Sequence, residues 1–187
     1  MALYMPLPKG CVRLLRLLPP SGDKSRIECQ LITCSLLDSR RTHSYEALSY
    51  VWGLEKIKEP IWIEGLELSV GANLYAALSH LRDCFVERIL WIDAICINQG
   101  DDIEKGHQVE SMAKIYAKAS RVIVWLGEAT GNSDQALEVI RAAAEEQTMD
   151  PLTDETSKQA ILTLLERKWF QRIWVSNIIS IVITKQY

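Results

Sequence analysis

The chain has 187 residues, of which 48% are hydrophobic, and a mean hydropathy of +0.00, a globular composition of about one domain. A compact chain of this length buries roughly 70% of its unfolded surface, so it can hold a core without disulfides or a metal. Its 21 basic and 24 acidic residues give a net charge of -3 without a Lys/Arg run. These numbers argue against nucleic acid and anionic membranes as partners.

The cysteine pattern and the N-terminus indicate an intracellular protein. The five cysteines are widely spaced and form no CxxC pair, which favours buried thiols in a reducing compartment over a disulfide framework or a zinc site. The N-terminal MALYMPLPKG has no long apolar stretch, so it is not typical of a secretory signal. The apolar run 178–183 is too short to span a membrane. We therefore expect a soluble, cytoplasmic protein without a bound metal.

The first part of the chain has the pattern of short strands joined in hairpins. Two apolar runs, 12–18 and 27–37, flank the turn-forming segment PPSGDKS and predict a hairpin. Residues 45–52 are apolar and aromatic, which is typical of a buried strand. Residues 61–63 and 66–70, divided by a Glu-Gly pair, predict a second hairpin.

The pattern then changes to helical spacing followed by a long apolar run. Asn73 can cap a helix over residues 73–85. Segment 88–97, RILWIDAICI, has too little polar alternation for a half-exposed strand and predicts a strand buried on both faces. The apolar positions of the helix are Leu74, Leu78, Leu81 and Phe85.

Three helices and one strand complete the predicted elements. A helix follows the polar stretch after residue 97, and residues 122–126 predict another buried strand. Ser133 can cap a helix that runs to about Gln147, and helical spacing resumes over 155–167 after Pro151. The positions expected to face inward are Val109, Met112, Ile115, Tyr116 and Ala119 in the first of these helices, and Leu137, Ile140 and Ala144 in the second.

The order of these elements predicts the fold class. Strands that alternate with helices favour an α/β fold with a mostly parallel sheet flanked by helices, to which the N-terminal β-hairpins add antiparallel strands. The sequence has no internal repeat or linker, so one domain is the simplest interpretation. It also has no GxGxxG, GxxxxGK[ST], GxSxG or HExxH, which removes most support for dinucleotide folds, phosphate loops and serine hydrolases.

Polar residues at the predicted strand ends are the candidate site. Asp93 interrupts an apolar run, and ligands of open α/β sheets bind outside the carboxyl ends of strands. In the alternative interpretation Asp93 bonds to nearby backbone and the NQGDD turn only caps the next helix. Core packing is the simplest role for Tyr50 and Trp52. The candidate ligand-binding residues are Ser49, Asp93, Asn98, Gln99 and Asp101.

Three segments in one order carry a family resemblance: YEALSYVWG, LWIDAICINQGD, and EKGHQVESMAKIYAKASRVIVWLG. Together with WFQRIW they resemble the heterokaryon incompatibility (HET) domain of filamentous fungi. The resemblance divides the chain into an N-terminal hairpin region (1–44), the domain (45–175) and a divergent tail (176–187). The motif residues are Tyr45, Leu48, Ser49, Tyr50, Trp52, Gly53, Trp91, Ile92, Asp93, Ile95, Cys96, Ile97, Asn98, Gln99, Trp125, Leu126, Gly127, Trp169, Phe170, Arg172 and Trp174.

The resemblance implies a cytosolic fungal protein of self/non-self recognition and regulated cell death. HET domains are in turn similar to Toll/interleukin-receptor (TIR) domains, which implies a flavodoxin-like sheet. Its partners would be other incompatibility proteins or a second copy, which could assemble through the 96–105 segment as a non-catalytic module.

The TIR similarity also raises NAD as a substrate, although no cofactor is certain. Enzymatic TIR domains use a Glu four residues after a Trp, and a carboxylate there can stabilise an oxocarbenium-like state while Asp93 and Ser49 place the nucleotide. Counted from Trp174, this chain has Ile178 at that position and Asn177 at the family's Gln position. The catalytic residues are therefore unknown, and the sequence predicts a truncated form without NAD cleavage, whose tail is an intron read-through.

Overall fold

The computed structural model describes residues 3–22, 25–37, 44–53, 57–131, 133–144 and 155–172. The chain divides into two compact units. The described residues up to Trp125 form one unit, and the described residues from Leu126 onward form the other. The sequence had suggested one domain, and the two units are described separately below.

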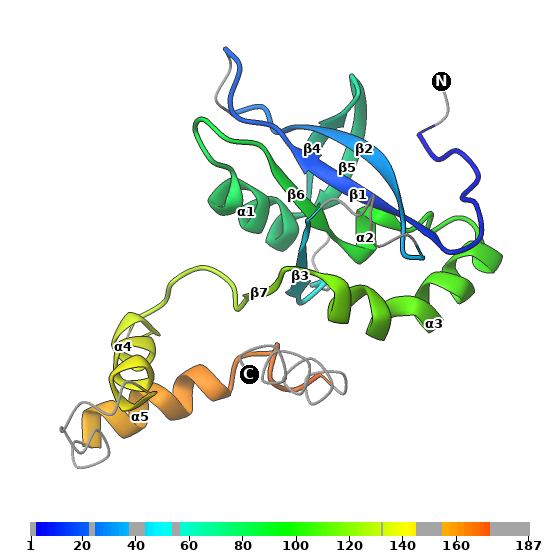
Figure 1. The fold of residues 1–187 in the computed structure, drawn as a ribbon. Coiled ribbons are helices and arrows are strands. Elements are labelled where there is room, and N and C mark those ends of the chain that lie inside the picture. The colour runs from blue at the N-terminus through cyan, green and yellow to red at the C-terminus, as the bar shows by residue number, and fades with distance from the viewer. Residues whose placement is uncertain are drawn as a thin grey trace. The chain divides into compact units, whose positions relative to one another are not determined.

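The first unit contains a sheet of seven strands (Figure 1). They are β1 (Cys11–Leu17), β2 (Glu28–Ser35), β3 (Glu46–Tyr50), β4 (Lys58–Ile63), β5 (Leu66–Gly71), β6 (Arg88–Trp91) and β7 (Arg121–Trp125). Their spatial order is β5-β4-β2-β1-β6-β3-β7.

The predicted α/β class is confirmed. β3 pairs in parallel with both β6 and β7, and helices lie between these strands along the chain. The predicted N-terminal hairpin is the antiparallel pair β1 and β2, and β1 also pairs antiparallel with β6. The sheet is therefore mixed, with a parallel core at β6-β3-β7 and antiparallel additions on one side.

The second predicted hairpin is also confirmed. β4 and β5 pair antiparallel around Glu64 and Gly65, which have φ angles of 52° and 83°. Two positive φ angles in a two-residue loop are the geometry of a type I′ turn, which matches the twist of the strands. β4 also pairs in parallel with β2, and this pairing joins the hairpin to the rest of the sheet.

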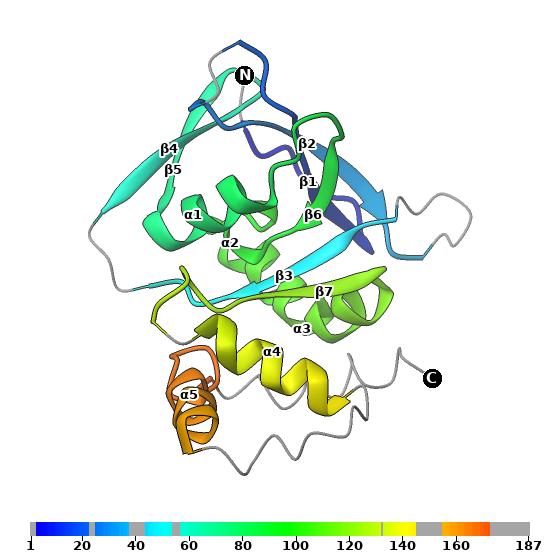
Figure 2. The same cartoon turned by 90° about the vertical axis from the view of Figure 1, so that its left-hand side faces the viewer.

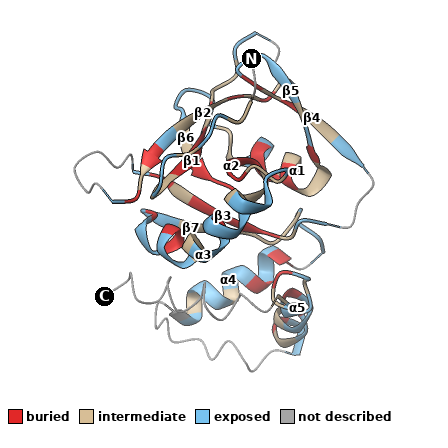
Figure 3. Cartoon of the chain, turned by 90° about the vertical axis from the view of Figure 1, so that its right-hand side faces the viewer, coloured by how far each residue is buried: buried red, intermediate tan, exposed pale blue. Residues whose placement is uncertain are grey.

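The described part of this unit contains three helices: α1 (Ala72–Leu81), α2 (Asp93–Cys96) and α3 (Asp102–Lys118). The strands are arranged around α1 and α2 (Figure 2). Both helices bury apolar side chains, among them Leu74 and Leu78 of α1 and Ile95 of α2. Figure 3 shows buried residues gathered along the central strands, and β1 and β3 are almost fully buried.

The prediction for the helix over 73–85 was wrong at both ends. Gly71 precedes α1 without a side-chain cap, so Asn73 does not cap the helix. The helix ends at Leu81, and Asp83 accepts hydrogen bonds from the backbone N–H groups of the two residues at 85 and 86. This local turn competes with helix continuation, and it leaves Phe85 90% exposed.

The long strand predicted over 88–97 was also wrong. β6 ends at Trp91, and the apolar residues that follow belong to the short helix α2. The Cys96 N–H donates to Ile92 O at 2.7 Å, which closes a helical turn. Because both segments are buried, the apolar run shows neither the alternation of a half-exposed strand nor the spacing of an amphipathic helix, so its sequence does not distinguish the two.

The remaining elements of this unit were placed correctly, with two differences in burial. In α3, Ile115 and Tyr116 are buried as predicted, but Val109 is 44% exposed and Gln108 takes a buried position instead. β7 is only half-buried because it is the edge strand of the sheet. Within the described ranges, no helix combines the length and apolar character needed to cross a membrane.

The second unit contains α4 (Ser133–Ala144) and α5 (Glu155–Leu165). Its small core consists of Ala136, Ala160 and Leu164. Leu137 and Ile140 were predicted to face inward but are 48% and 43% exposed, because α4 packs through the small side chain of Ala136. The predicted positions at 147 and 151, the side chain at 144 and the tail 176–187 lie outside the described residues.

Candidate functional site at the carboxyl ends of the parallel strands

Trp52 and Asp93 meet at the carboxyl ends of β3 and β6. The Trp52 Nε1–H donates to both carboxylate oxygens of Asp93, each at 3.0 Å. Asp93 also accepts from the N–H of Ala94, the second residue of α2. The predicted core role of Trp52 is wrong, because its side chain is 48% exposed, whereas Tyr50 is buried as predicted. Trp52 projects beyond the last residue of β3 and is held there by a carboxylate.

Asn73 links the same edge of the sheet to α1. Its Nδ2 donates to Val51 O at 2.7 Å, and its Oδ1 accepts from Trp125 Nε1–H at 2.9 Å. One amide side chain therefore bridges the residue after β3 and the last residue of β7. The sequence predicts a helix cap for Asn73, and no local pattern indicates this non-local bridge.

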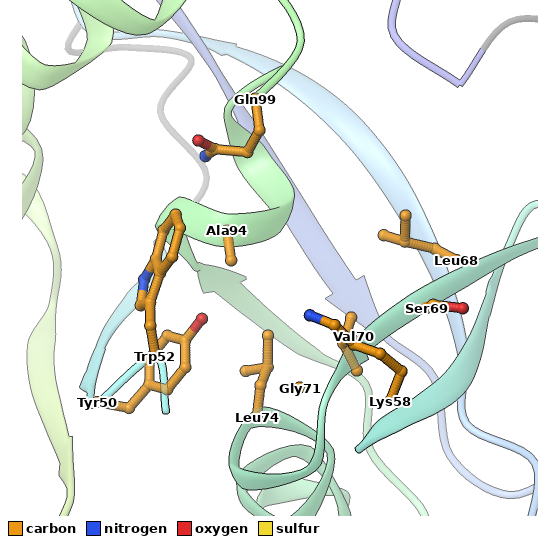
Figure 4. Close-up of a pocket in the computed structure, with 10 residues that line it drawn as sticks. All are labelled: Tyr50, Trp52, Lys58, Leu68, Ser69, Val70, Gly71, Leu74, Ala94 and Gln99. Atoms are coloured by element: carbon orange, nitrogen blue, oxygen red, sulfur yellow. The ribbon is translucent and has the colours of Figure 1, made fainter. Parts of the chain in front are cut away.

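A pocket of about 190 Å³ opens beside Trp52 (Figure 4). Tyr50 and Trp52 form one side of it, and the β4–β5 hairpin forms the opposite side. Small ligand sites in proteins usually measure about 300–1,000 Å³, so this pocket is suited to a very small ligand. The hairpin, helix and turn residues that line it are Lys58, Leu68–Gly71, Leu74, Ala94 and Gln99.

The structure brings two of the five predicted ligand-binding residues together. Gln99 lines the pocket, and its Nε2 donates to the backbone oxygen of Asp93 at 3.0 Å. Ser49 is 2% exposed and does not line the pocket. Asn98 accepts from the N–H of residue 100, and Asp101 caps α3, so both serve the turn itself. For these two residues the structural interpretation describes the contacts better than the ligand-binding one.

An ion pair holds this turn in place. Glu104 Oε1 accepts from the Asn98 N–H at 2.8 Å and from Arg13 Nη1 at 2.5 Å. Burial alone would raise the pKa of Glu104, but the Arg13 guanidinium and the Asn98 N–H lower it below its ordinary value. The 96–105 segment is therefore not a free loop, since only residues 97–101 lie between α2 and α3.

The cysteines offer no activated nucleophile at this edge. Burial raises the pKa of Cys96 and of Cys29 to about 12, so both thiols stay protonated at neutral pH. Cys84 is exposed, which corrects the expectation that all the thiols are buried, because it lies in the turn that Asp83 forms. Among the described residues, no group of three His, Cys, Asp or Glu side chains could hold a metal ion.

Glu46 belongs to the opposite end of the parallel strands. It begins β3, whereas Tyr50 ends this strand. Arg88 donates to its Oε2 through Nε at 2.8 Å and through Nη2 at 2.6 Å, and Arg121 pairs with its Oε1. The cluster joins β6, β3 and β7, and its role is structural.

Lys58 is the charged pocket residue that the sequence does not predict. It lies in a polar stretch before the predicted 61–63 strand, and nothing local marks it. It reaches the site because β4 pairs with β2, and this pairing sets the hairpin opposite Tyr50. Only the non-local strand order reveals such a residue.

Comparison with known protein families matches residues 45–177 to the family described as heterokaryon incompatibility protein (HET). The chain belongs to the HET family. It is 33% identical over 170 residues to Heterokaryon incompatibility protein 6, OR allele, of Neurospora crassa. That alignment covers 84% of this chain and 24% of the relative, so the chain spans about a quarter of that protein's length. No solved structure matches the chain.

The HET motif blocks coincide with the elements that build this edge of the sheet. YEALSY contains β3, LWIDAIC contains the end of β6 and α2, and VIVW ends β7. In the other unit, Trp169 is buried and makes an edge-to-face contact with Phe170, with ring centroids 5.1 Å apart. Trp174, Asn177 and Ile178 lie outside the described residues. The TIR-like arrangement stays a prediction, because no solved structure matches.

Proposed function

We propose that this chain acts in heterokaryon incompatibility, as a cytoplasmic domain that triggers cell death when incompatible hyphae fuse. The observation that carries the proposal is the HET family match, whose motif blocks form one connected edge through Trp52, Asp93 and Gln99. The similarity to a Neurospora crassa protein named for heterokaryon incompatibility supports it.

The contacts at this edge support a binding role. The Asp93 carboxylate accepts from Trp52 after β3, the Asn73 amide links α1 to Val51 after β3, and the Glu104 carboxylate accepts from the 97–101 turn. These hydrogen bonds hold the strand end, the helix and the turn in one arrangement. We propose that the arrangement presents a surface to other incompatibility proteins or to a second copy of the chain.

NAD cleavage gains no support from these contacts. The pocket of about 190 Å³ is smaller than the usual range for drug-sized ligands, and a dinucleotide is larger still. We therefore keep the binding role as the proposal.

The test is expression of the full 187-residue chain from an inducible promoter in Neurospora crassa hyphae. A membrane-impermeant dye then counts the dead hyphal compartments. We expect the wild-type chain to raise this count, and Asp93→Ala and Trp52→Phe to return it to the empty-vector level at equal protein amounts. Trp52→Phe keeps an aromatic ring but removes the N–H that Asp93 accepts, together with part of the indole surface.

Lys114→Met is the matched control, because Lys114 is exposed on α3 and lies outside the pocket. The Lys114→Met chain should raise the count of dead hyphal compartments as much as the wild-type chain does. Survival of hyphae that express the wild-type chain would overturn the proposed function. Killing by Asp93→Ala at the wild-type rate would overturn the role of the Trp52–Asp93 pair.

A further inference from the structure

We propose that the pocket between the end of β3 and the β4–β5 hairpin binds a small aromatic carboxylate, that is, one ring with one anionic group. The inference rests on the pocket of the purified chain and does not depend on the proposed role in incompatibility. Its two requirements are a cation that meets the anionic group and an aromatic wall that meets the ring.

Two polar groups point into the pocket from opposite sides. Figure 4 shows the Lys58 ammonium and the Tyr50 hydroxyl directed toward the same space. The side chains of Leu74 and Ala94 lie between them, from α1 and α2. The ammonium matches a carboxylate, because it can donate a charge-assisted hydrogen bond to one of its oxygens.

The charge of the pocket favours an anion. Among the described residues that line it, Lys58 is the only charged one, and it forms no ion pair with any described residue. The nearby carboxylate of Asp93 accepts the Trp52 indole N–H with both oxygens and is absent from the lining. The ammonium therefore keeps its capacity to pair with a ligand.

The aromatic wall and the volume of the pocket indicate that the part of the ligand beyond its anionic group is a single ring. Trp52 is half-exposed, and its bond to Asp93 fixes the indole at the pocket. A planar ring packs on such a wall better than an aliphatic group does. A cavity of about 150 Å³ accommodates benzene, so a pocket of about 190 Å³ holds a single ring with one substituent. Val70 and Leu74 supply apolar surface for that ring.

The experiment is a titration of the ¹⁵N-labelled 187-residue chain with sodium benzoate, followed by two-dimensional NMR. We expect the Trp52 indole N–H signal to shift and saturate, with a Kd on the order of 1 mM for so few ligand atoms. Benzamide keeps the ring without the charge, and acetate keeps the charge without the ring. Each should bind at least about fivefold more weakly, the size of one exposed ion pair or ring contact.

Variants assign the binding to the pocket. Lys58→Met should weaken benzoate binding about fivefold, as for a solvent-exposed ion pair, and leave benzamide binding unchanged. Lys114→Met removes an exposed lysine outside the pocket and should bind benzoate as the wild type does. Trp52→Leu should lose preference for benzoate over acetate, with the Ala94 amide signal as the readout.

Three results would overturn the proposal: benzoate shifts that do not saturate, equal affinity for benzoate and benzamide, or benzoate affinity unchanged in Lys58→Met. The hyphal assay measures cell death and this titration measures ligand binding, so a failure here is distinct from a failure of the proposed function.

Discussion

At the residue scale, Arg13 fixes the position of the 97–101 turn, called the motif turn below, through hydrogen bonds to Cys96 O and Glu104. Arg13 is 4% exposed although it carries a charge. Its guanidinium pairs with Glu104, donates to the backbone oxygens of Met5 and Cys96, and lies over the ring of Tyr4 at 5.0 Å. A buried charge needs such partners, because its removal from water costs several kcal/mol. The N-terminal segment and the motif turn thus share one buried cation.

Glu104→Gln should destabilise the protein in a pH-dependent way. Loss of one partner leaves the buried Arg13 charge uncompensated, so we expect a loss of about 2–4 kcal/mol at pH 7 in urea denaturation. The pKa of folded Glu104 is lowered, so its ionised form stabilises the fold above the unfolded pKa, and this stabilisation is lost as pH falls through the folded pKa. The difference between variant and wild type should therefore shrink toward about pH 3.

The control for this prediction is Glu110→Gln, an exposed glutamate on the same helix. Substitution there should change the free energy of unfolding by less than about 0.5 kcal/mol. A Glu104→Gln loss of equal size at pH 7 and at low pH would contradict the role of the ionised carboxylate.

Individual residues were predicted correctly where their place in the fold follows from a general rule for parallel sheets. Asp93 and Gln99 were selected because ligands of parallel sheets bind beyond the carboxyl ends of strands, and Gln99 does line the pocket. The pocket position of Lys58 and the bridging role of Asn73 could not be predicted, because both depend on contacts between segments that are distant in the sequence. The exposure of Trp52 could not be predicted either, since an aromatic residue at a strand end has the same pattern whether it is packed or projects outward.

At the scale of elements, a charge cluster joins the starts of the three parallel strands. Glu46 on β3 pairs with Arg88 on β6 and with Arg121 on β7. Arg88 also donates to Leu81 O at the end of α1 at 3.0 Å, so the same guanidinium links a helix end to the sheet. The side chains of Glu46 and Arg88 are 14% and 21% exposed, whereas that of Arg121 is 68% exposed.

Glu46→Gln should cost about 1–3 kcal/mol of unfolding free energy, because a mostly buried guanidinium loses its charged partner. Arg121→Gln removes the exposed partner and should cost less than about 1 kcal/mol. Urea denaturation of the two variants under one buffer measures both values. A larger loss for Arg121→Gln than for Glu46→Gln would contradict this account of the cluster.

Element prediction was reliable where a period or a turn pair marked the segment. Both hairpins were found from turn residues, and β3 and β7 from short apolar runs. The 88–97 segment was misassigned because burial on all sides removes the alternation that distinguishes a strand from a helix. The prediction for the inward face of α4 was wrong. The helix packs against α5 through Ala136, whereas the hydrophobicity pattern is dominated by the larger apolar side chains at 137 and 140, which are exposed.

At the scale of the whole molecule, the family match and the fold have different N-terminal limits. The HET match begins at residue 45, and the motif order predicts that residues 1–44 are a hairpin region leading into the domain. In the structure, β1 lies inside the sheet, between β2 and β6, with Leu15 paired to Leu90. Val12, Leu14 and Leu15 have no exposed surface.

Deletion of residues 1–44 should therefore prevent the first unit from folding. The truncated chain would lose β1 and β2, expose the paired edge of β6 and leave Glu104 without Arg13. We expect it to aggregate or to lack dispersed NMR signals, whereas the full chain is folded. A monomeric 45–187 chain with native-like amide dispersion would contradict this prediction.

The central position of β1 also has a consequence for synthesis on the ribosome. β1 can pair with β2 soon after both emerge, but its other neighbour, β6, begins at Arg88. At about 5–20 residues per second, the nascent hairpin waits several seconds with one edge of β1 unpaired. During that interval its apolar residues are open to chaperones and to other nascent chains. The yield of folded protein should thus depend on translation speed between β2 and β6 more than on speed elsewhere in the first unit.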